Sequence, residues 1–255
     1  MIWLETLGRR TTEFIEEAGR ISQMFIQTVK WSLRPPLGFR NIMKQMEEIG
    51  VRSVPVVLIT AISTGMVLAL QSHTGFKRFN AESLVGTVVA LSMTRELGPV
   101  LTGLIVAGRA GAAMAAELGT MRVTEQIDAL AVMAANPIKY LAVPRLLASM
   151  VMLPLLTIFA DAIGIAGGYL IAVKMLAVNP VVYLRRTTDY LEYDDIYGGL
   201  LKAFVFGMII ATISCYKGFN AGGGAAGVGK ATTGAVVLSS MLILISDYFM
   251  TAMLF

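Results

Sequence analysis

The segment "NAGGGAAGVGKATTG", from Asn220 to Gly234, resembles a loop that binds nucleotide phosphates. Gly224, Gly229 and Lys230 fit most of the pattern G-x-x-x-x-G-K-[ST]. A phosphate-binding loop also needs a buried strand before it, and a Ser or Thr after the lysine to hold magnesium. Here Ala231 follows the lysine and the apolar stretch "AFVFGMIIATISCYKGF" precedes the loop. The sequence therefore predicts a tight link between two helices, with Thr232 or Thr233 capping the second, and no nucleotide site.

A second set of residues with chemical potential consists of charges inside apolar stretches. Arg95 and Glu96 are adjacent, and each end of their apolar stretch is about 12 residues away, which predicts a position near the bilayer midplane. A charge there costs at least about 3 kcal/mol, so it must face a protein interior or a cavity and have a partner. The other deeply placed charges, and so the predicted partners, are Asp161, Lys202 and Asp247.

These charges have two possible roles. Arg95 is suited to a phospholipid phosphate, since a guanidinium binds phosphate oxygens through several donors at once, and Gly98–Pro99 loosens the helix beside it. We therefore expect Arg95 and Glu96 to border a lipid cavity. The alternative is that the pair only fixes the packing of the helices.

The elements that must position these charges are membrane helices. The chain has 255 residues, of which 56% are hydrophobic and 15% charged, whereas a soluble domain carries about 25% charged residues. Each of five apolar stretches is long enough to cross a bilayer, which takes about 20 residues. The stretches run over 53–72, 83–108, 146–173, 196–216 and 231–255. The predicted fold is an all-α membrane protein with five transmembrane helices.

Residues 1–52 form a separate N-terminal region in this interpretation, followed by a transmembrane domain over 53–255. The first 30 residues are amphipathic and predict a helix that lies along the membrane surface, or alternatively a soluble packing helix. Its apolar positions are Leu4, Leu7, Phe14, Ala18, Ile21 and Phe25, and Trp3 and Trp31 are expected at headgroup depth. A second short helix, which contains Lys44, Glu47 and Glu48, leads to the first crossing.

The loop charges predict the orientation of the bundle. The loops on the side of the N-terminus carry 14 Lys and Arg residues, against five in the loops of the other side. The positive-inside rule then places the N-terminus in the cytoplasm and the C-terminus outside. No basic run is dense enough for nucleic acid, and the single histidine, His73, has no second metal ligand nearby, so neither nucleic acid nor metal is expected.

A charged amphipathic segment over 117–135 lies between the second and third crossings. It predicts a short cytoplasmic helix that ends before Asn136 and Pro137. Its function is either to dock a cytoplasmic partner or only to connect two crossings. The residues expected to take part in docking are Glu117, Arg122, Glu125, Gln126 and Asp128.

The stretch "RELGPVLTGLIVAGRAGAAMAAELGTMRVTEQIDAL" resembles the signature of the MlaE-type permeases, the membrane subunits of MCE-associated lipid ABC transporters. The segments "GVGKATTGAVVLSS" and "DYFMTAMLF" resemble the C-terminal end of the same family. The resemblance covers nearly the whole chain and implies a homodimer of five-crossing subunits in a bacterial inner membrane. It assigns the docking role to the cytoplasmic helix and gives the chain no enzymatic activity.

The resemblance also implies the partners. ATP and Mg²⁺ would bind to a separate ABC ATPase subunit, and this chain would bind no cofactor. A ring of MCE-domain subunits, expected to be hexameric, would sit on the periplasmic side, and some systems add a STAS-domain subunit. Together they would move phospholipid between inner and outer membranes and maintain outer-membrane lipid asymmetry.

Two other functions compete with that of a lipid permease. One is an ion-coupled secondary transporter that uses the intramembrane charges as a relay. The other is a membrane scaffold without transport activity. Transport by the isolated protein under a proton gradient would favour the first rival.

Overall fold

The structure is a computed structural model that describes residues 2–36, 38–79 and 81–254; within the first helix it describes the side chains from Arg9 onward, except those at 10 and 14. The described residues contain helices and no strand, which confirms the predicted all-α class. The helices are α1 (Ile2–Ser32), α2 (Phe39–Ile49), α3 (Val54–Lys77), α4 (Val85–Ser92), α5 (Gly98–Val106), α6 (Ala112–Val123), α7 (Gln126–Val132), α8 (Val143–Lys174), α9 (Pro180–Tyr190), α10 (Tyr193–Phe219) and α11 (Gly224–Leu254).

Five helical stretches are long and apolar enough to cross a membrane, as predicted. They are Phe39–Lys77, Glu82–Val123, Ile138–Lys174, Tyr193–Phe219 and Gly224–Leu254. The second stretch is 42 residues long, so it runs well past the predicted end at Gly108. Two π-helical turns, Met93–Leu97 and Ala107–Gly111, join α4, α5 and α6 without a break.

Arg109 lies inside the second stretch, just beyond the end predicted at residue 108, because its charge is satisfied by α2 and the turn that follows. Its Nε donates to Ser53 Oγ (2.8 Å), and its Nη2 donates to the carbonyl oxygens of Glu48 and Ile49. These carbonyls belong to the last turn of α2, where a cation is favourable. Arg109 therefore ties α2 to the second stretch.

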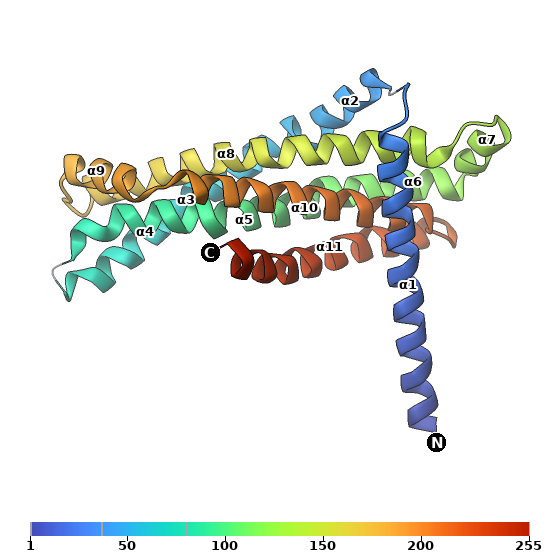
Figure 1. Ribbon diagram of the computed structural model, residues 1–255, viewed down its shortest axis with the longest axis horizontal. Coiled ribbons are helices and arrows are strands. Elements are labelled where there is room, and N and C mark those ends of the chain that lie inside the picture. Colours follow the sequence, from blue (N-terminus) through green and yellow to red (C-terminus); the bar gives the residue numbers. More distant parts are fainter. Residues whose placement is uncertain (1, 37, 80, 255) are drawn as a thin grey trace.

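The crossing helices run side by side along the long axis of the molecule, and α1 lies crosswise at one end of the bundle (Figure 1). The closest packing is between α3 and α8, where glycines bring the two backbones together. A Cβ atom added at Gly65 would lie 1.9 Å from the carbonyl oxygen of Gly164, and one at Gly167 would lie 2.7 Å from that of Ile62. Small residues allow such an approach in membrane proteins, where packing stabilises helix association.

Replacing Gly65 with alanine is expected to destabilise the protein by about 1–3 kcal/mol, because the methyl group would force α3 and α8 apart. Gly75→Ala is the matched control in the same helix, since an added Cβ there meets no atom within 4 Å. Thermal unfolding in detergent should show a lower melting temperature for the first variant only. Equal melting temperatures for the two variants would mean that α3 and α8 are less closely packed at Gly65 than in this structure.

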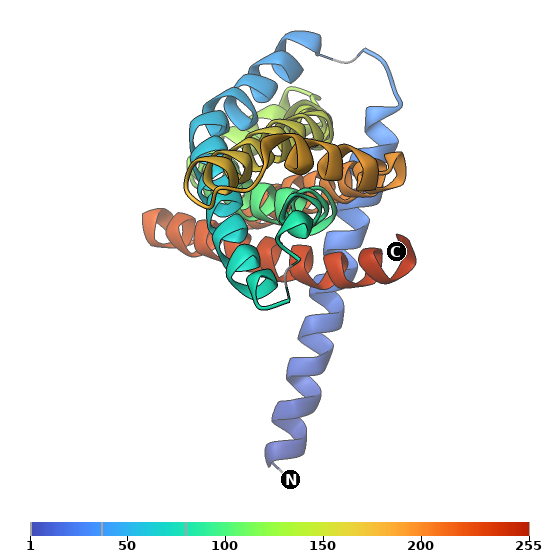
Figure 2. The ribbon, with the colours of Figure 1, turned by 90° about the vertical axis from the view of Figure 1, so that its left-hand side faces the viewer.

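Two features set α1 apart from the bundle. Its N-terminal half projects beyond α11 in two perpendicular views (Figures 1 and 2), and its C-terminal half is held by polar contacts. Lys217 on α10 pairs with Glu17, and the Trp31 ring stacks against Arg34 and Lys139. The predicted headgroup depth of Trp31 stays a prediction, and the side chains of Trp3, Leu4, Leu7 and Phe14 lie outside the described residues.

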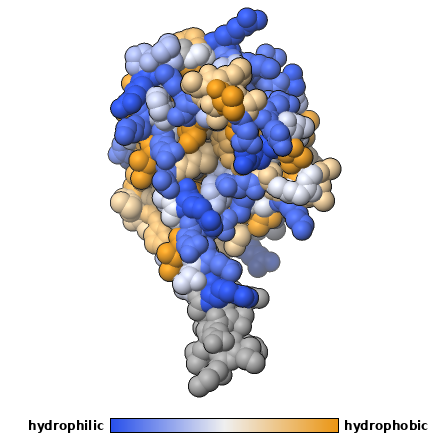
Figure 3. Space-filling model, turned by 90° about the vertical axis from the view of Figure 1, so that its right-hand side faces the viewer, coloured by the Kyte–Doolittle hydropathy of each residue, from blue (hydrophilic) through white to orange (hydrophobic). Residues whose placement is uncertain are grey.

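The segment over 117–135 is not the single helix that the sequence predicted. It comprises the end of α6 and a separate helix α7, because Glu125 has a left-handed backbone (φ 59°) that a helix cannot contain. The segment ends before Asn136, as predicted, since Ala134 is also left-handed (φ 58°). Figure 3 views this end of the bundle, where hydrophilic residues predominate.

The glycine-rich segment also differs from its prediction. Only residues 220–223 form the link, and α11 begins at Gly224. Gly223 and Gly224 both have positive φ, and a Cβ added at Gly227 would lie 1.5 Å from the carbonyl oxygen of Gly222. The glycines therefore permit the tight link. Thr232 and Thr233 lie within α11 and donate to the carbonyl oxygens of Val228 and Gly229, so neither caps it.

Candidate functional site: a charge cluster inside the bundle

The π-helical turn Met93–Leu97 presents two adjacent charges to α10. The guanidinium of Arg95 lies 2.6 Å from Asp195 Oδ1 through Nε and again through Nη2. Glu96 Oε1 lies 2.8 Å from Lys202 Nζ. Adjacent helical residues point in directions about 100° apart, and each charge accordingly has a partner of its own, as the sequence predicted.

Lys202 is the centre of the cluster, and its side chain is fully buried. Its Nζ lies 3.1 Å from Asp247 Oδ1 on α11, in addition to the contact with Glu96. It also donates to the backbone oxygen of Arg95 (2.9 Å) and to Thr251 Oγ1 (2.7 Å). Thr251 Oγ1 in turn donates to Glu96 Oε1 (3.0 Å). One ammonium group thus joins the second, fourth and fifth crossings.

Asp195 is the member of the cluster that the sequence analysis missed. The predicted fourth crossing began at residue 196, but Asp195 is the third residue of α10 and its side chain is 2% exposed. Its Oδ2 accepts a hydrogen bond from the backbone N–H of Glu192 (3.0 Å), which completes a capping box at the helix start. The acidic pair three residues apart was the available signal for a helix that begins here.

Asp161 is not part of the cluster, although the sequence named it as a possible partner. It lies on α8 against Gly98, where an added Cβ would be 1.8 Å from Asp161 Oδ1. That oxygen has no hydrogen-bond partner among the described residues. Asp161 therefore lies where α5 approaches α8 closely at Gly98, and it takes part in no ion pair of the cluster.

The cluster lies closer to one end of the bundle than the predicted midplane position. Asp195 is at the start of α10, and Thr251 is in the last turn of α11. Arg95 lies in the first third of the long stretch Glu82–Val123. The predicted end of the second crossing at Gly108 was wrong, because the helix continues for 15 more residues and therefore has a different centre. The position of Arg95 and Glu96 relative to the bilayer midplane stays a prediction.

Exposure divides the cluster into a buried core and an accessible edge. The side chains of Lys202 and Asp195 are 0% and 2% exposed, whereas those of Arg95 and Glu96 are 38% and 36% exposed. A bound molecule would therefore meet Arg95 and Glu96 first. Arg95 is the cation at this edge that an anionic group could approach, and the two buried charges hold the edge residues in place.

The residues predicted to dock a partner lie at the other end of the bundle. Glu117 Oε2 pairs with Arg145 Nη2 on α8 (2.6 Å), and Arg145 is nearly fully buried. Arg122 pairs with Asp128 across the break between α6 and α7, and Gln126 Nε2 donates to Thr124 Oγ1 (3.0 Å). Glu125 is exposed, as are the apolar side chains of Val132 and Met133 at the tip.

An all-helical bundle with five membrane-length apolar helices and paired charges between them defines an integral membrane protein with several crossings. The family of the permease MlaE matches residues 42–253, which include all five stretches almost completely. The chain belongs to this permease family.

Individual relatives cover the chain almost from end to end. A probable ABC transporter permease protein of Rickettsia felis is 53% identical over 250 residues, which are 98% of this chain and 96% of that protein. The intermembrane phospholipid transport system permease protein MlaE of Haemophilus influenzae is 35% identical over 254 residues, or 99% and 97% of the two chains. The chloroplastic protein TRIGALACTOSYLDIACYLGLYCEROL 1 of Arabidopsis thaliana is 40% identical over 229 residues, or 90% and 65%.

Proposed function

We propose that this chain is the permease subunit of an ABC-type transporter that moves phospholipid between the inner and outer membranes of a bacterium. The observation that carries the proposal is the charge cluster with an accessible Arg95, placed inside the region that matches the MlaE family. A phospholipid has a phosphate for the guanidinium and acyl chains for the apolar helices around it. Arg95 and Glu96 are the proposed substrate-binding residues, and the chain itself is not an enzyme.

The energy would come from a separate ATPase subunit that binds ATP and Mg²⁺, so this chain would hold no cofactor. In support, the glycine-rich segment is helical from Gly224 onward and is not preceded by a strand. The proposed docking surface consists of α7 and its junction with α6. Its exposed Glu125 and Asp128 beside the apolar Val132 and Met133 combine charge and apolar contact, as protein interfaces do.

Reversing the charges of the docking surface should weaken its complex with the ATPase. Glu125→Lys combined with Asp128→Lys is expected to lower the affinity by at least about tenfold, or 1.4 kcal/mol, because the charge that the proposed interface presents to its partner is inverted. Co-purification of the ATPase with the tagged permease measures the loss. Asp189→Lys on α9, at the other end of the bundle, is the control and should leave the complex intact. An unchanged complex in the double variant would mean that the ATPase docks elsewhere.

The proposed assembly is a homodimer in the inner membrane with its N-terminus in the cytoplasm and its C-terminus in the periplasm. Only Ala231, Ala235, Ser239 and Ile243 of α11 are buried, and its opposite face exposes apolar side chains, among them Met241, Leu244 and Tyr248. This face is suited to a second copy. An MCE-domain ring, expected to be hexameric, would cover the α9 end, and a STAS-domain subunit is a further possible partner at the α7 end.

Purification with the proteins encoded beside it, followed by mass spectrometry of the bound lipid, tests the proposed function. We expect phospholipid in the complex and lipid transfer between vesicles that requires ATP and the partner ATPase. Transfer by this chain alone under a proton gradient would instead indicate the ion-coupled transporter. A complex that binds no lipid and transfers none would leave a scaffold role.

A further inference from the structure

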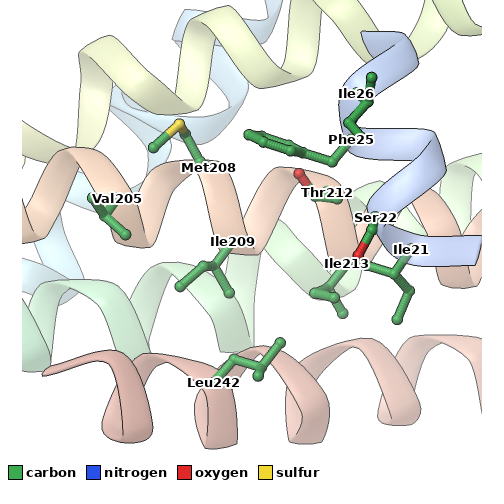
Figure 4. A pocket seen from close by; sticks show the side chains of 10 residues that line it. All are labelled: Ile21, Ser22, Phe25, Ile26, Val205, Met208, Ile209, Thr212, Ile213 and Leu242. Atoms are coloured by element: carbon green, nitrogen blue, oxygen red, sulfur yellow. The ribbon is translucent and has the colours of Figure 1, made fainter. Parts of the chain in front are cut away.

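A pocket that none of the functions above uses lies where α1 crosses α10 and α11. Its volume is about 370 Å³, and Figure 4 shows side chains from these three helices around one space. Phe25 comes from α1, Met208 and Ile209 come from α10, and Leu242 comes from α11. We call this space the α1 pocket. Its volume falls within the range of pockets that bind small molecules, about 300–1,000 Å³.

The lining selects for an apolar occupant. No charged residue lines the pocket, and the two polar side chains are Ser22 and Thr212. The Ser22 hydroxyl already donates to the carbonyl oxygen of Ala18 (2.8 Å). A space lined by eight apolar side chains and two hydroxyls favours hydrocarbon over water.

Polar groups stand just beyond one end of the pocket. The ion pair Glu17–Lys217 bridges α1 and α10, and each of its members is one helical turn outside the lining residues Ile21 and Ile213. Arg20 is exposed on the same stretch of α1 and has no ion-pair partner among the described residues. A charged boundary next to an apolar space matches a molecule with an anionic head and a hydrocarbon tail.

We propose that the α1 pocket binds one acyl chain of a phospholipid from the leaflet on which α1 lies. The nearest lining residue along α10, Val205, is three residues or about 4.5 Å from Lys202, but no residue of the charge cluster lines the pocket, so the two sites are distinct. The bound chain fills the space between α1 and the crossings and so fixes the angle at which α1 leaves the bundle. The proposal goes beyond the proposed function, since the site binds lipid whether or not the protein transports it.

Photolabelling tests the site in the full-length protein, purified with its partners. The probe is phosphatidylethanolamine with a diazirine at the end of one acyl chain, at low abundance in vesicles of phosphatidylethanolamine and phosphatidylglycerol. Peptide mapping by mass spectrometry should find the label on the pocket residues of α1 and α10. Their labelling should exceed that of the exposed α3 side chains Ile59 and Val67 by about tenfold. A specific site holds the probe longer than the weak contacts that bulk lipid makes with an exposed helix face.

Filling the pocket supplies the control. Ile209→Trp should cut the pocket label about tenfold, because the indole occupies the space of the acyl chain. Val67→Trp, on the exposed face of α3, should leave it unchanged. Leu242→Trp fills the same pocket from α11, so one of the two filling variants suffices if the other fails to fold, as judged by gel filtration.

Two results would overturn the proposal. Equal labelling of the pocket and of α3 in the unaltered protein would mean that the pocket is in contact with bulk lipid only and is not a specific site. An unlabelled pocket, together with disulfide-linked dimers of a Leu242→Cys variant, would mean that a second copy fills the space. Strong pocket labelling in a protein that transfers no lipid would support the site and count only against the transport function.

Discussion

Replacing Lys202 with alanine is expected to abolish lipid transfer and to destabilise the protein by about 3–5 kcal/mol, the usual cost of breaking a buried ion pair. The lysine is fully buried, and its ammonium is the shared partner of Glu96 and Asp247. Without it, the carboxylates of Glu96 and Asp247 lose the ammonium group that lies between them and repel each other. Thermal unfolding in detergent and vesicle-to-vesicle lipid transfer measure the two effects.

A neutral version of the cluster separates its structural role from its transport role. Lys202→Met combined with Glu96→Gln and Asp247→Asn removes all three charges, so stability should largely return, since apolar or neutral groups often replace a buried charge cluster well. Transfer should remain lost. Lys174→Ala, at the exposed end of α8, is the control for an ordinary lysine. Full transfer by the triple variant would show that Lys202, Glu96 and Asp247 serve packing alone.

Arg95→Ala is expected to have the second-largest effect. It leaves Asp195 with a buried carboxylate whose remaining hydrogen bond comes from the backbone of Glu192, so we expect a loss of about 3–5 kcal/mol of stability. Lipid transfer should fall at least tenfold, about 1.4 kcal/mol or more, since the accessible guanidinium is the proposed phosphate ligand.

The double variant Arg95→Met with Asp195→Asn distinguishes the two roles of Arg95. Asparagine keeps an oxygen for the Glu192 N–H, and no charge is left unpaired, so stability should recover with a coupling energy of about 1–3 kcal/mol. Transfer should stay low if Arg95 binds lipid phosphate. Arg185→Ala breaks an exposed pair with Asp189 and should change stability by less than about 1 kcal/mol. Recovery of both stability and transfer in the double variant would reduce Arg95 to a structural residue.

The sequence by itself determined the number of crossings and the charges that lie within them. Both follow from the composition of contiguous stretches, because a span of about 20 apolar residues is long enough for a bilayer whatever it packs against. The family resemblance also rested on contiguous residues, and the match to residues 42–253 confirms it. The requirement that Arg95 and Glu96 each have a partner came from the cost of an unpaired charge in that medium.

Only the tertiary structure decided which charges meet. Arg95 pairs with Asp195, which is 100 positions away in the chain, while Asp161 lies against Gly98 outside the cluster. Similarly, the helix boundaries near Glu125 and Gly223–Gly224 differ from the predicted ones. The backbone at these residues has positive φ, which the periodicity of the sequence does not reveal. The reason is physical: hydrophobicity fixes that a helix crosses the membrane. The rotation, the depth and the partners of that helix depend on how side chains from separate helices pack together. This packing cannot be read from the residues of one segment alone.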